Sequence, residues 1–236
     1  MAQLKDYLFY QDDWATIYCG NCLEIMPLME PEGVDLVVTD PPYFLPVQHY
    51  QTRKKFSRNF SDLGILEHFF KDFFRLINIS ISQNGTIYMF CDGQSYPLFY
   101  YHLYPFCKAL RPLIWDKKTS INGYGWRHQH EIIIFAEMPT SKPIPTGDGD
   151  ILRFDAVKVD RREHPAEKPF KLINSLVKKS TIEQQLVFDP FLGSGTTCMA
   201  AKNLNRKSIG IEINPKYCEI TVKRLRQEVL DFRKEN

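Results

Sequence analysis

The chain has 236 residues, of which 44% are hydrophobic and 25% charged, and its formal net charge is +2 at pH 7. This length can bury a full core, and the composition is ordinary for a soluble globular protein. No apolar run approaches the roughly 18 residues of a membrane span, and the polar N-terminus lacks the charged-then-apolar pattern of a signal peptide. We therefore expect a single domain, residues 1–236, in the cytoplasm. The net charge is too small to argue for a nucleic-acid partner by itself.

Hydrophobic periodicity predicts strands and helices that alternate along most of the chain. In chain order, the first elements are the strand Ala15–Cys19, the helix Cys22–Met29, the strand Val34–Thr39, the helix Glu67–Ser82, the strand Thr86–Cys91 and the helix Ser95–Cys107. The later ones are the strands Leu110–Trp115 and His130–Ala136, the helix Phe170–Lys179, the strand Gln185–Phe188, the helix Thr196–Leu204, the strand Ser208–Ile213 and the helix Lys216–Phe232. Two segments rich in Gly, Pro, Ser and charge are expected to be irregular, Thr119–Gln129 and Met138–Glu163. The alternation predicts an α/β fold with a mainly parallel sheet.

Six cysteines are scattered along the chain. Cys19 and Cys22 form a lone CxxC pair, but no second pair follows to complete a zinc site. A redox pair is the alternative. Most of the cysteines lie in apolar strand or helix patterns, so we expect reduced core thiols and no metal.

The first cluster of chemical interest is Asp40-Pro41-Pro42-Tyr43, which directly follows the nearly continuous apolar strand Val34–Thr39. Such a strand is typical of the buried centre of a parallel sheet, where ligands bind at the strand ends. The two prolines fix the backbone. The Asp40 carboxylate and the Pro41 carbonyl would then form a fixed row of acceptors for an amino group, with Tyr43 as a flat stacking face. The alternative is a rigid turn that only ends the strand.

The second cluster is the segment Asp189-Pro190-Phe191-Leu192-Gly193-Ser194-Gly195-Thr196-Thr197, between an expected strand and helix. Its glycines permit a tight turn and the close approach of a ligand to the backbone. Glu212 ends the next strand. An acid about 20 residues beyond a Gly-rich strand–turn–helix is the usual arrangement for holding ribose hydroxyls. The loop lacks the GK[ST] of a P-loop, so we do not expect a triphosphate.

Together these motifs resemble those of the β-class of amino-methylating DNA methyltransferases, in which the catalytic motif precedes the cofactor motif. Asp40-Pro41-Pro42-Tyr43 resembles the catalytic motif, and 189–197 resembles the methionine-binding Gly loop. His164-Pro165-Ala166-Glu167-Lys168-Pro169 resembles a further cofactor-binding motif. The three motifs occur in the family's order. The resemblance spans nearly the whole chain and is strongest at 34–43 and 164–217.

The resemblance implies a doubly wound, mainly parallel, Rossmann-like sheet with a circularly permuted motif order. The strand ending at Asp189 should lie beside the strand ending at Asp40, with S-adenosylmethionine as the cofactor. The residues assigned to the cofactor are Asn21, Lys168, Asp189, Phe191, Gly193, Gly195, Thr196 and Glu212. One residue departs from the pattern, because Gly20-Asn21 stands where many members have Gly-Asp. The uncharged Asn21 should weaken cofactor binding without abolishing it.

The expected reaction is methylation of N6 of adenine in a base flipped out of double-stranded DNA. Asp40 and the Pro41 carbonyl would accept hydrogen bonds from the amine, while Pro42 stiffens the loop and Tyr43 stacks on the base. Methylation of N4 of cytosine is the nearest alternative, because both amines suit the same acceptors. Within the family, Asp at the first motif position favours adenine and Ser favours cytosine. A catalytically silent DNA-binding subunit is a further alternative, which Asn21 slightly favours and the intact Asp40 opposes.

Target recognition should lie in small segments within about 45–62, 117–130 and 138–163. The basic residues suited to phosphate contacts are Arg53, Lys54, Lys55 and Arg58, and the candidates for base contacts are Arg127 and His128. A solvated basic loop is the alternative for the first group. By analogy with the family, a homodimer and a cognate restriction enzyme are further partners to test.

Overall fold

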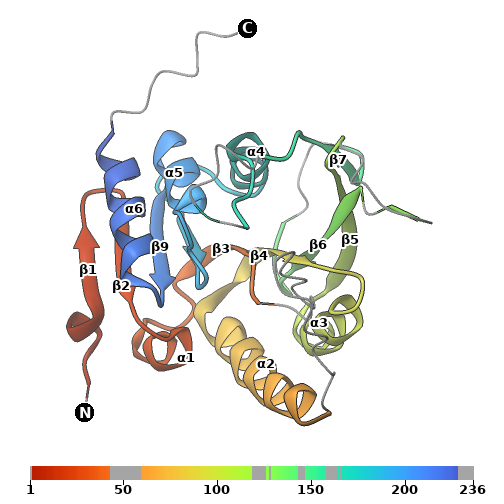
Figure 1. Ribbon diagram of the computed structural model, residues 1–236, viewed down its shortest axis with the longest axis horizontal. Helices are drawn as coiled ribbons and strands as arrows, with labels where there is room; N and C mark the ends of the chain where they lie inside the picture. The colour runs from red at the N-terminus through yellow and green to blue at the C-terminus, as the bar shows by residue number, and fades with distance from the viewer. Residues whose placement is uncertain are drawn as a thin grey trace, which may run out of the picture.

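The protein is described from a computed structural model that covers residues 2–42, 60–118, 126–127, 129–142, 147–157, 164 and 166–227, with the backbone alone for 60–67. Within this part of the chain, nine strands form one sheet in the order β1-β2-β9-β8-β3-β4-β6-β5-β7 (Figure 1). The strands are β1 (Leu8–Gln11), β2 (Ala15–Cys19), β3 (Val34–Thr39), β4 (Ile81–Cys91), β5 (Ala109–Asp116), β6 (His130–Glu137), β7 (Ile151–Arg153), β8 (Leu186–Asp189) and β9 (Lys207–Glu212). The α-helices are α1 (Cys22–Ile25), α2 (Phe60–Ser80), α3 (Tyr96–Leu103), α4 (Phe170–Ser180), α5 (Thr196–Asn203) and α6 (Pro215–Arg226).

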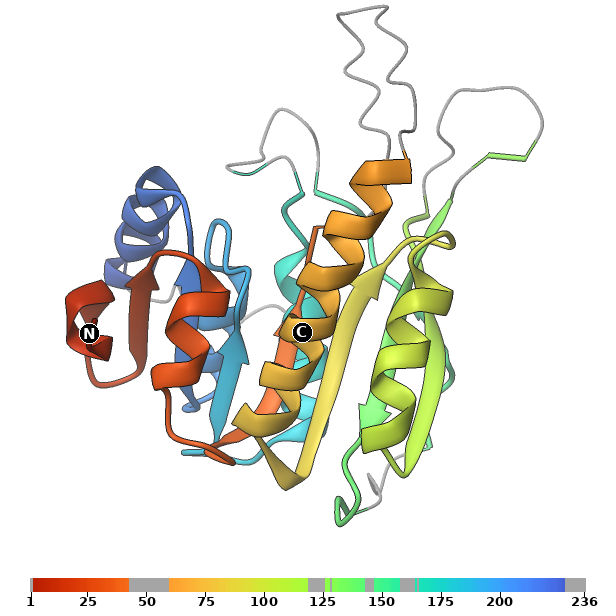
Figure 2. The same ribbon diagram turned by 90° about the horizontal axis from the view of Figure 1, so that it is seen from below.

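The centre of the sheet is parallel, as expected. The strands β2, β9, β8, β3 and β4 run in the same direction, and β1, β6 and β5 add antiparallel pairs at the two sides. The helices α1, α2 and α3 cover one face of the sheet, and α4, α5 and α6 cover the other (Figures 1 and 2). The result is the three-layer α/β architecture that the alternation of elements predicts.

The strand β3 is apolar on both sides because it lies between these two helical layers. Val34 and Val37 belong to the core cluster that includes α2 and α3, whereas Leu36 and Val38 belong to the cluster that includes α4. Two-sided burial explains why its sequence is a nearly continuous apolar run.

The position of β3 also determines where a ligand can bind. It pairs with β4 on one side and with β8 on the other, in register Leu36↔Val187. Asp40 and Asp189 therefore emerge at the same edge of the sheet, which confirms the expected adjacency of the two motif-bearing strands. The crevice at such a switch point is the usual ligand site of an open α/β sheet.

Two short strands were not expected. β1 pairs with β2, and β7 pairs with β5 at Ile114↔Ile151, so the prediction that 138–163 is irregular is wrong at Ile151–Arg153. Both are edge strands of three or four residues, which is too short for a periodic signal.

Several predicted helix ends also need correction. α2 begins at Phe60, well before the expected Glu67. Cys22–Met29 is an α-helix only to Ile25, followed by a 3-10 turn (Met26–Leu28) that contains Pro27. Likewise, α3 ends at Leu103 before a 3-10 turn (Tyr104–Phe106). α6 begins at Pro215 and ends at Arg226, and the expected continuation to Phe232 lies outside the described residues.

All six cysteines are free thiols, and four of them are buried, in agreement with the expected reduced core. Among the described residues, no helix combines the length and apolarity needed to cross a bilayer.

Candidate active site

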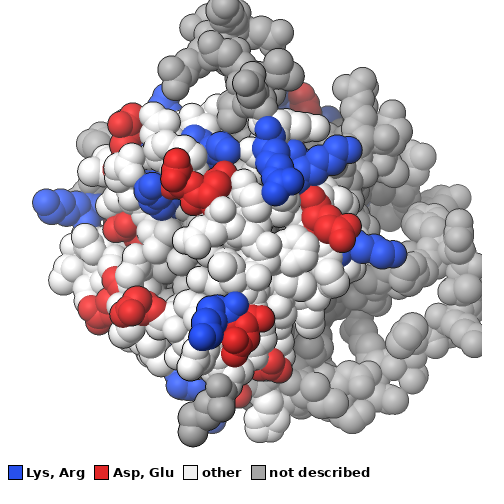
Figure 3. Space-filling view, turned by 90° about the vertical axis from the view of Figure 1, so that its left-hand side faces the viewer, with Lys and Arg blue, Asp and Glu red and all other residues white. Residues whose placement is uncertain are grey.

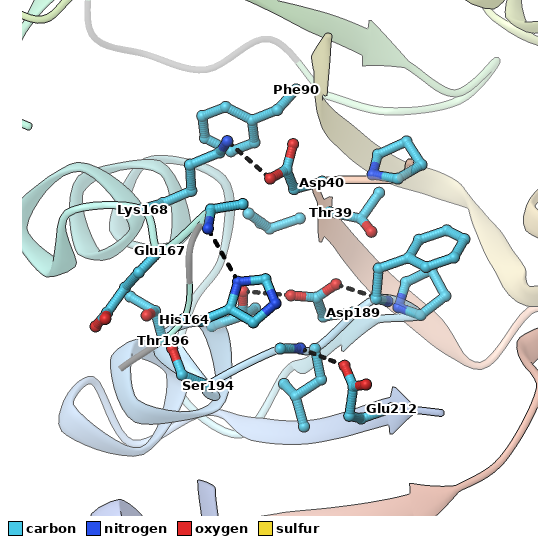
Figure 4. A pocket seen from close by; sticks show the side chains of 18 of the residues that line it. Thr39, Asp40, Phe90, His164, Glu167, Lys168, Asp189, Ser194, Thr196 and Glu212 are labelled. Carbon is cyan, nitrogen blue, oxygen red and sulfur yellow. Dashed lines mark hydrogen bonds and ion pairs between the residues drawn. The ribbon is translucent and has the colours of Figure 1, made fainter. Parts of the chain in front are cut away.

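A cavity of about 840 Å³ lies at the carboxyl ends of β2, β3, β8 and β9 and at the start of β6 (Figure 4). The Gly loop and the segment before α4 form one part of its wall, and the ends of β3, β4 and β5 form another. The expected site residues that line it are Asn21, Asp40, Pro41, Pro42, Lys168, Asp189, Phe191, Gly193, Thr196 and Glu212. The structure therefore brings the catalytic and cofactor motifs to one cavity.

The buried Asp189 carboxylate forms hydrogen bonds with both ends of the Gly loop. Its Oδ1 accepts a hydrogen bond from the Phe191 N–H (3.1 Å), and its Oδ2 accepts one from the Thr197 hydroxyl (2.7 Å). Burial raises the pKa of Asp189 to about 7, although these two hydrogen bonds act in the opposite direction. Asp189 was expected to bind the cofactor. Its described contacts also make it the anchor for both ends of the loop.

The two glycines allow the loop to turn tightly at the cavity wall. Gly193 and Gly195 have φ of 54° and 83°, the left-handed region in which a side chain is strained. A Cβ on Gly195 would lie 2.3 Å from the Thr221 side chain, and one on Gly193 would lie 3.6 Å from the His164 ring. Backbone conformation therefore favours glycine at both positions, and the contact with Thr221 adds a steric reason at Gly195.

Glu212 connects the end of β9 to this loop. Its Oε2 accepts a hydrogen bond from the Gly193 N–H and its Oε1 accepts one from the Asn214 N–H, both at 2.8 Å. Its backbone carbonyl also accepts from Gly20 N–H (3.0 Å). Each carboxylate oxygen has two lone pairs, so these bonds are compatible with the expected role in binding ribose.

The segment that resembles the third motif packs against the Gly loop through α6. The His164 ring contacts the Tyr217 ring edge-on (4.4 Å between centroids), and burial lowers the His164 pKa below its usual value. Arg224 bonds Glu167 Oε1 (3.0 Å) and the Ser194 carbonyl (2.9 Å) through the same Nη1. Arg224 thus joins two cofactor motifs that lie far apart in the sequence.

At the end of the cavity formed by β3, Lys168 reaches from this segment to Asp40. Its Nζ lies 2.7 Å from Asp40 Oδ2 and 4.8 Å from the centre of the Phe90 ring (Figure 4). The same Nζ lies 3.0 Å from Glu131 Oε2. Burial would lower the pKa of Lys168, but the Asp40 and Glu131 carboxylates raise it above its usual value. Lys168 was expected among the cofactor residues, and its described ionic contacts are with Asp40 of the first motif and with Glu131 of β6.

Sequence reasoning missed Glu131, Lys117 and the aromatic walls formed by Phe90 and Trp115, all of which line the cavity. Burial would raise the pKa of Glu131, but Lys168 and Lys117 lower it below its usual value. The sequence feature that could have indicated Glu131 is its position as an acid near the start of the apolar strand His130–Glu137.

Asn21, which lines the cavity, also caps α1, because its Oδ1 accepts a hydrogen bond from the Leu23 N–H (3.0 Å). Arg127 is exposed and is not among the lining residues. The expected residues outside the described part of the chain are Tyr43, Arg53, Lys54, Lys55, Arg58 and His128.

The charged residues that line the cavity are compatible with S-adenosylmethionine. Among the described lining residues, acids outnumber lysines: Asp40, Glu131, Glu167, Asp189 and Glu212 against Lys117 and Lys168. The cofactor carries a net positive charge, from a sulfonium and an ammonium against one carboxylate. The N-terminus of α5 suits that carboxylate, and Glu212 suits the ribose.

Comparison with known proteins agrees with this geometry. A family model described as DNA methylase (N6_N4_Mtase) matches residues 34–223. The chain is 26% identical to the type II methyltransferase M.HpaI of Haemophilus parainfluenzae, over 92% of this chain and 76% of that protein. It is 27% identical to M2.MboI of Moraxella bovis, over 94% and 91%. Among solved structures, the PvuII DNA methyltransferase (cytosine-N4-specific) superposes with a TM-score of 0.75 at 18% identity, covering 94% of this chain and 89% of that one.

The family match covers well over half of the chain and includes the catalytic motif, the Gly loop and the segment before α4. The cofactor of these methylases is S-adenosylmethionine. The chain therefore belongs to the N6/N4 DNA methylase family, the β-class of amino-methylating DNA methyltransferases.

Proposed function

We propose that this methyltransferase modifies N6 of adenine in a base flipped out of double-stranded DNA. The observation that carries the proposal is the position of the Asp40 carboxylate, at the end of β3 and in the same cavity as the Gly loop and Glu212. The carbonyl of Pro41 follows it on a backbone that two prolines stiffen.

The difficulty of the reaction lies with the nucleophile, since the lone pair of an aromatic amine is delocalised into the ring. When bound, S-adenosylmethionine supplies an electrophilic methyl group. Hydrogen bonds from the amine to Asp40 and to the Pro41 carbonyl would raise the electron density on nitrogen and orient its lone pair. Positioning and electrostatics would then provide most of the acceleration. Asp40 need not be a strong base, because the proton can leave after methyl transfer.

The catalytic end of the cavity has apolar and aromatic walls that suit a flat aromatic ligand such as a nucleobase. Phe90, Trp115, Ala156 and Ile173 line it beside Asp40. Enzymes that act on a base take it out of the helix and hold it against such apolar and aromatic walls. These walls support a flipped base as the substrate.

The adenine assignment rests on Asp40, since Asp in the first position of this motif favours adenine within the family. Cytosine N4 is the second candidate because its amine suits the same acceptors, and the PvuII methyltransferase, a structural neighbour, is cytosine-N4-specific. The two products differ in the modified base and are separated by base analysis.

We also propose that residues 1–236 act as one methyltransferase domain, with target recognition in segments within about 45–62, 117–130 and 138–163. Support comes from the cavity rim, because Pro42, Lys117 and Ala156 all line the cavity and lie in or next to these segments. The Lys117 N–H donates to the Gln129 carbonyl (3.0 Å), which places both ends of the second segment beside Glu131. Arg53, Lys54, Lys55, Arg58 and Arg127 are the proposed DNA contacts.

The end of the molecule formed by β1 and α6 offers a contrast. Basic and acidic side chains are interspersed on its described surface (Figure 3). Lys202, for example, pairs with Asp12 (3.3 Å). Because its charges are mixed, this surface has no preference for a negatively charged ligand such as DNA. The proposed DNA contacts therefore lie in the segments next to the cavity. A homodimer and a cognate restriction enzyme stay predictions.

The decisive experiment measures transfer of radiolabelled methyl groups to duplex DNA, followed by base analysis. Wild-type protein should yield N6-methyladenine. Asp40→Ala should retain cofactor and DNA binding but lose transfer, because the contact matters most as positive charge develops on nitrogen. Asp72→Ala, an exposed residue of α2, is the matched control. Label in N4-methylcytosine would select the second candidate, and substantial transfer by Asp40→Ala would overturn the catalytic assignment.

A further inference from the structure

Glu131 is a second carboxylate at the catalytic end of the cavity. It is the second residue of β6 and shares a face of the sheet with Trp115, its cross-strand partner, and with Ile133, two residues along. This face packs against α4, as do Leu36 and Val38 of β3, which precede Asp40. Because β6 runs antiparallel to β4, its first residues reach the edge at which β3 ends.

The ammonium group of Lys168 lies between the two carboxylates. It is 2.7 Å from Asp40 Oδ2 and 3.0 Å from Glu131 Oε2, and only 9% of the side chain is exposed. Lys117 bonds the other oxygen of Glu131. Four side chains from separate parts of the chain therefore alternate in charge: Asp40, Lys168, Glu131 and Lys117.

We propose that Glu131 is a positioning residue for methyl transfer, which acts through Lys168 to hold the Asp40 carboxylate in place and to offset the ammonium charge beside it. This inference rests on the proposed role of Asp40. Glu131 would act on the reaction only through its contact with Lys168.

Glu131 helps to fix the position of the Lys168 ammonium group, because a lysine side chain is flexible. Its four-carbon stem gives the ammonium many positions, and one carboxylate alone would hold it weakly. Contact with Glu131 and the Phe90 ring leaves Lys168 one well-defined location. Asp40, whose loop continues from β3, then meets a fixed cation, as a preorganised acceptor requires.

Glu131 also affects the electrostatic balance around the reacting methyl group. The sulfonium of the cofactor is positive, and the amine gains positive charge during transfer. A buried ammonium next to Asp40 alone would cancel the carboxylate that should stabilise that charge. Without Glu131, Asp40 would stand against the two ammonium groups of Lys168 and Lys117; with Glu131 included, the four charges balance and no net positive charge faces the reaction centre.

The test uses Glu131→Gln, which keeps the shape of the side chain and removes its charge. Under saturating cofactor and DNA, kcat should fall by roughly 10- to 100-fold, the size of effect that a misplaced catalytic group produces. Glu137→Gln is the matched control, since Glu137 is a buried acid at the other end of β6 with ionic partners of its own, Lys108 and Arg111. Its kcat should stay within about twofold of wild type.

A double-mutant cycle separates positioning from a general structural effect. If Glu131 acts through Lys168, adding Glu131→Gln to Lys168→Met should change kcat by no more than about twofold. Glu131→Asp, which keeps the charge, should recover part of the lost kcat. Melting temperatures of all variants establish that they are folded, and Glu131→Ala, which also removes the charge, replaces Glu131→Gln if the latter unfolds.

Three outcomes overturn the inference: a wild-type kcat in Glu131→Gln, an equal loss in the presence and absence of Lys168, or no recovery in Glu131→Asp. Failure of the proposed function looks different. In that case Asp40→Ala itself would transfer methyl groups, whatever the result at Glu131.

Discussion

The carboxylate of Glu212 accepts a hydrogen bond from the backbone N–H of Gly193, with 2.8 Å between Oε2 and N. The bond joins the end of β9 to the turn after β8, the two neighbouring strands that form one side of the cavity. One carboxylate therefore shapes the loop and, at the same edge, is available for the ribose of the cofactor.

Replacing Glu212 should weaken cofactor binding. Glu212→Ala removes a charged acceptor and frees the Gly193 N–H, so the Kd for S-adenosylmethionine should rise roughly tenfold or more, as expected for one charged hydrogen bond. Isothermal titration calorimetry measures this directly. S-adenosylmethionine should also raise the melting temperature of the wild type, whereas ATP and NAD should not. Glu219→Ala, an exposed acid on α6, serves as the control, and an unchanged Kd in Glu212→Ala would remove Glu212 from the site.

The buried carboxyl of Asp189 should make stability depend on pH. Its pKa of about 7 in the folded protein lies above the ordinary 3.8, so the folded state keeps a proton that the unfolded state releases between these values. The resulting stabilisation is complete below the ordinary pKa and is lost as the pH rises through 7. Without cofactor, the melting temperature of the wild type relative to Asp189→Asn should fall between about pH 5 and pH 8. If the melting temperatures of the two proteins changed with pH in parallel, the raised pKa of Asp189 would be contradicted. Asp72→Asn is the control, since Asp72 is an exposed aspartate.

The basic residues at 53–58 lie outside the described part of the chain, and their role in DNA binding is tested by salt dependence. Neutralising Arg53, Lys54, Lys55 and Arg58 should lower DNA affinity. It should also flatten the slope of log K against log salt by about 0.9 per lost phosphate contact. Neutralising Lys171 and Lys178, exposed on α4, is the control for net charge. An unchanged slope would show that these side chains form a solvated basic loop.

Tyr43, also outside the described residues, should act through its ring. Tyr43→Ala should reduce both methyl transfer and retention of the flipped base, because stacking on one base is worth about 1–3 kcal/mol. Tyr43→Phe keeps the ring and should be mild. Fluorescence of 2-aminopurine at the target position reports the flipped state. Equal fluorescence in the wild type and Tyr43→Ala would place the stacking surface elsewhere, on a wall such as Phe90 or Trp115.

The chain order of the main elements and the two motif-bearing loops could be predicted because they depend on local properties. The apolar run Val34–Thr39, the prolines at 41–42 and the glycines at 193 and 195 each limit the backbone within a few residues. The strands β1 and β7 could not be predicted, because three or four residues become a strand only when a neighbouring strand supplies the hydrogen bonds.

The sequence by itself thus determined the nature of the site, with Asp40, Gly193 and Glu212 each at the end of a strand or in the turn after it. Only the tertiary structure decided that Lys168 contacts Asp40 and that Glu131, from β6, completes the group. The physical reason is that an ion pair depends on distance in space. The sheet order β8-β3-β4-β6 brings together strand ends that chain spacing does not reveal, and burial makes their charges interact strongly.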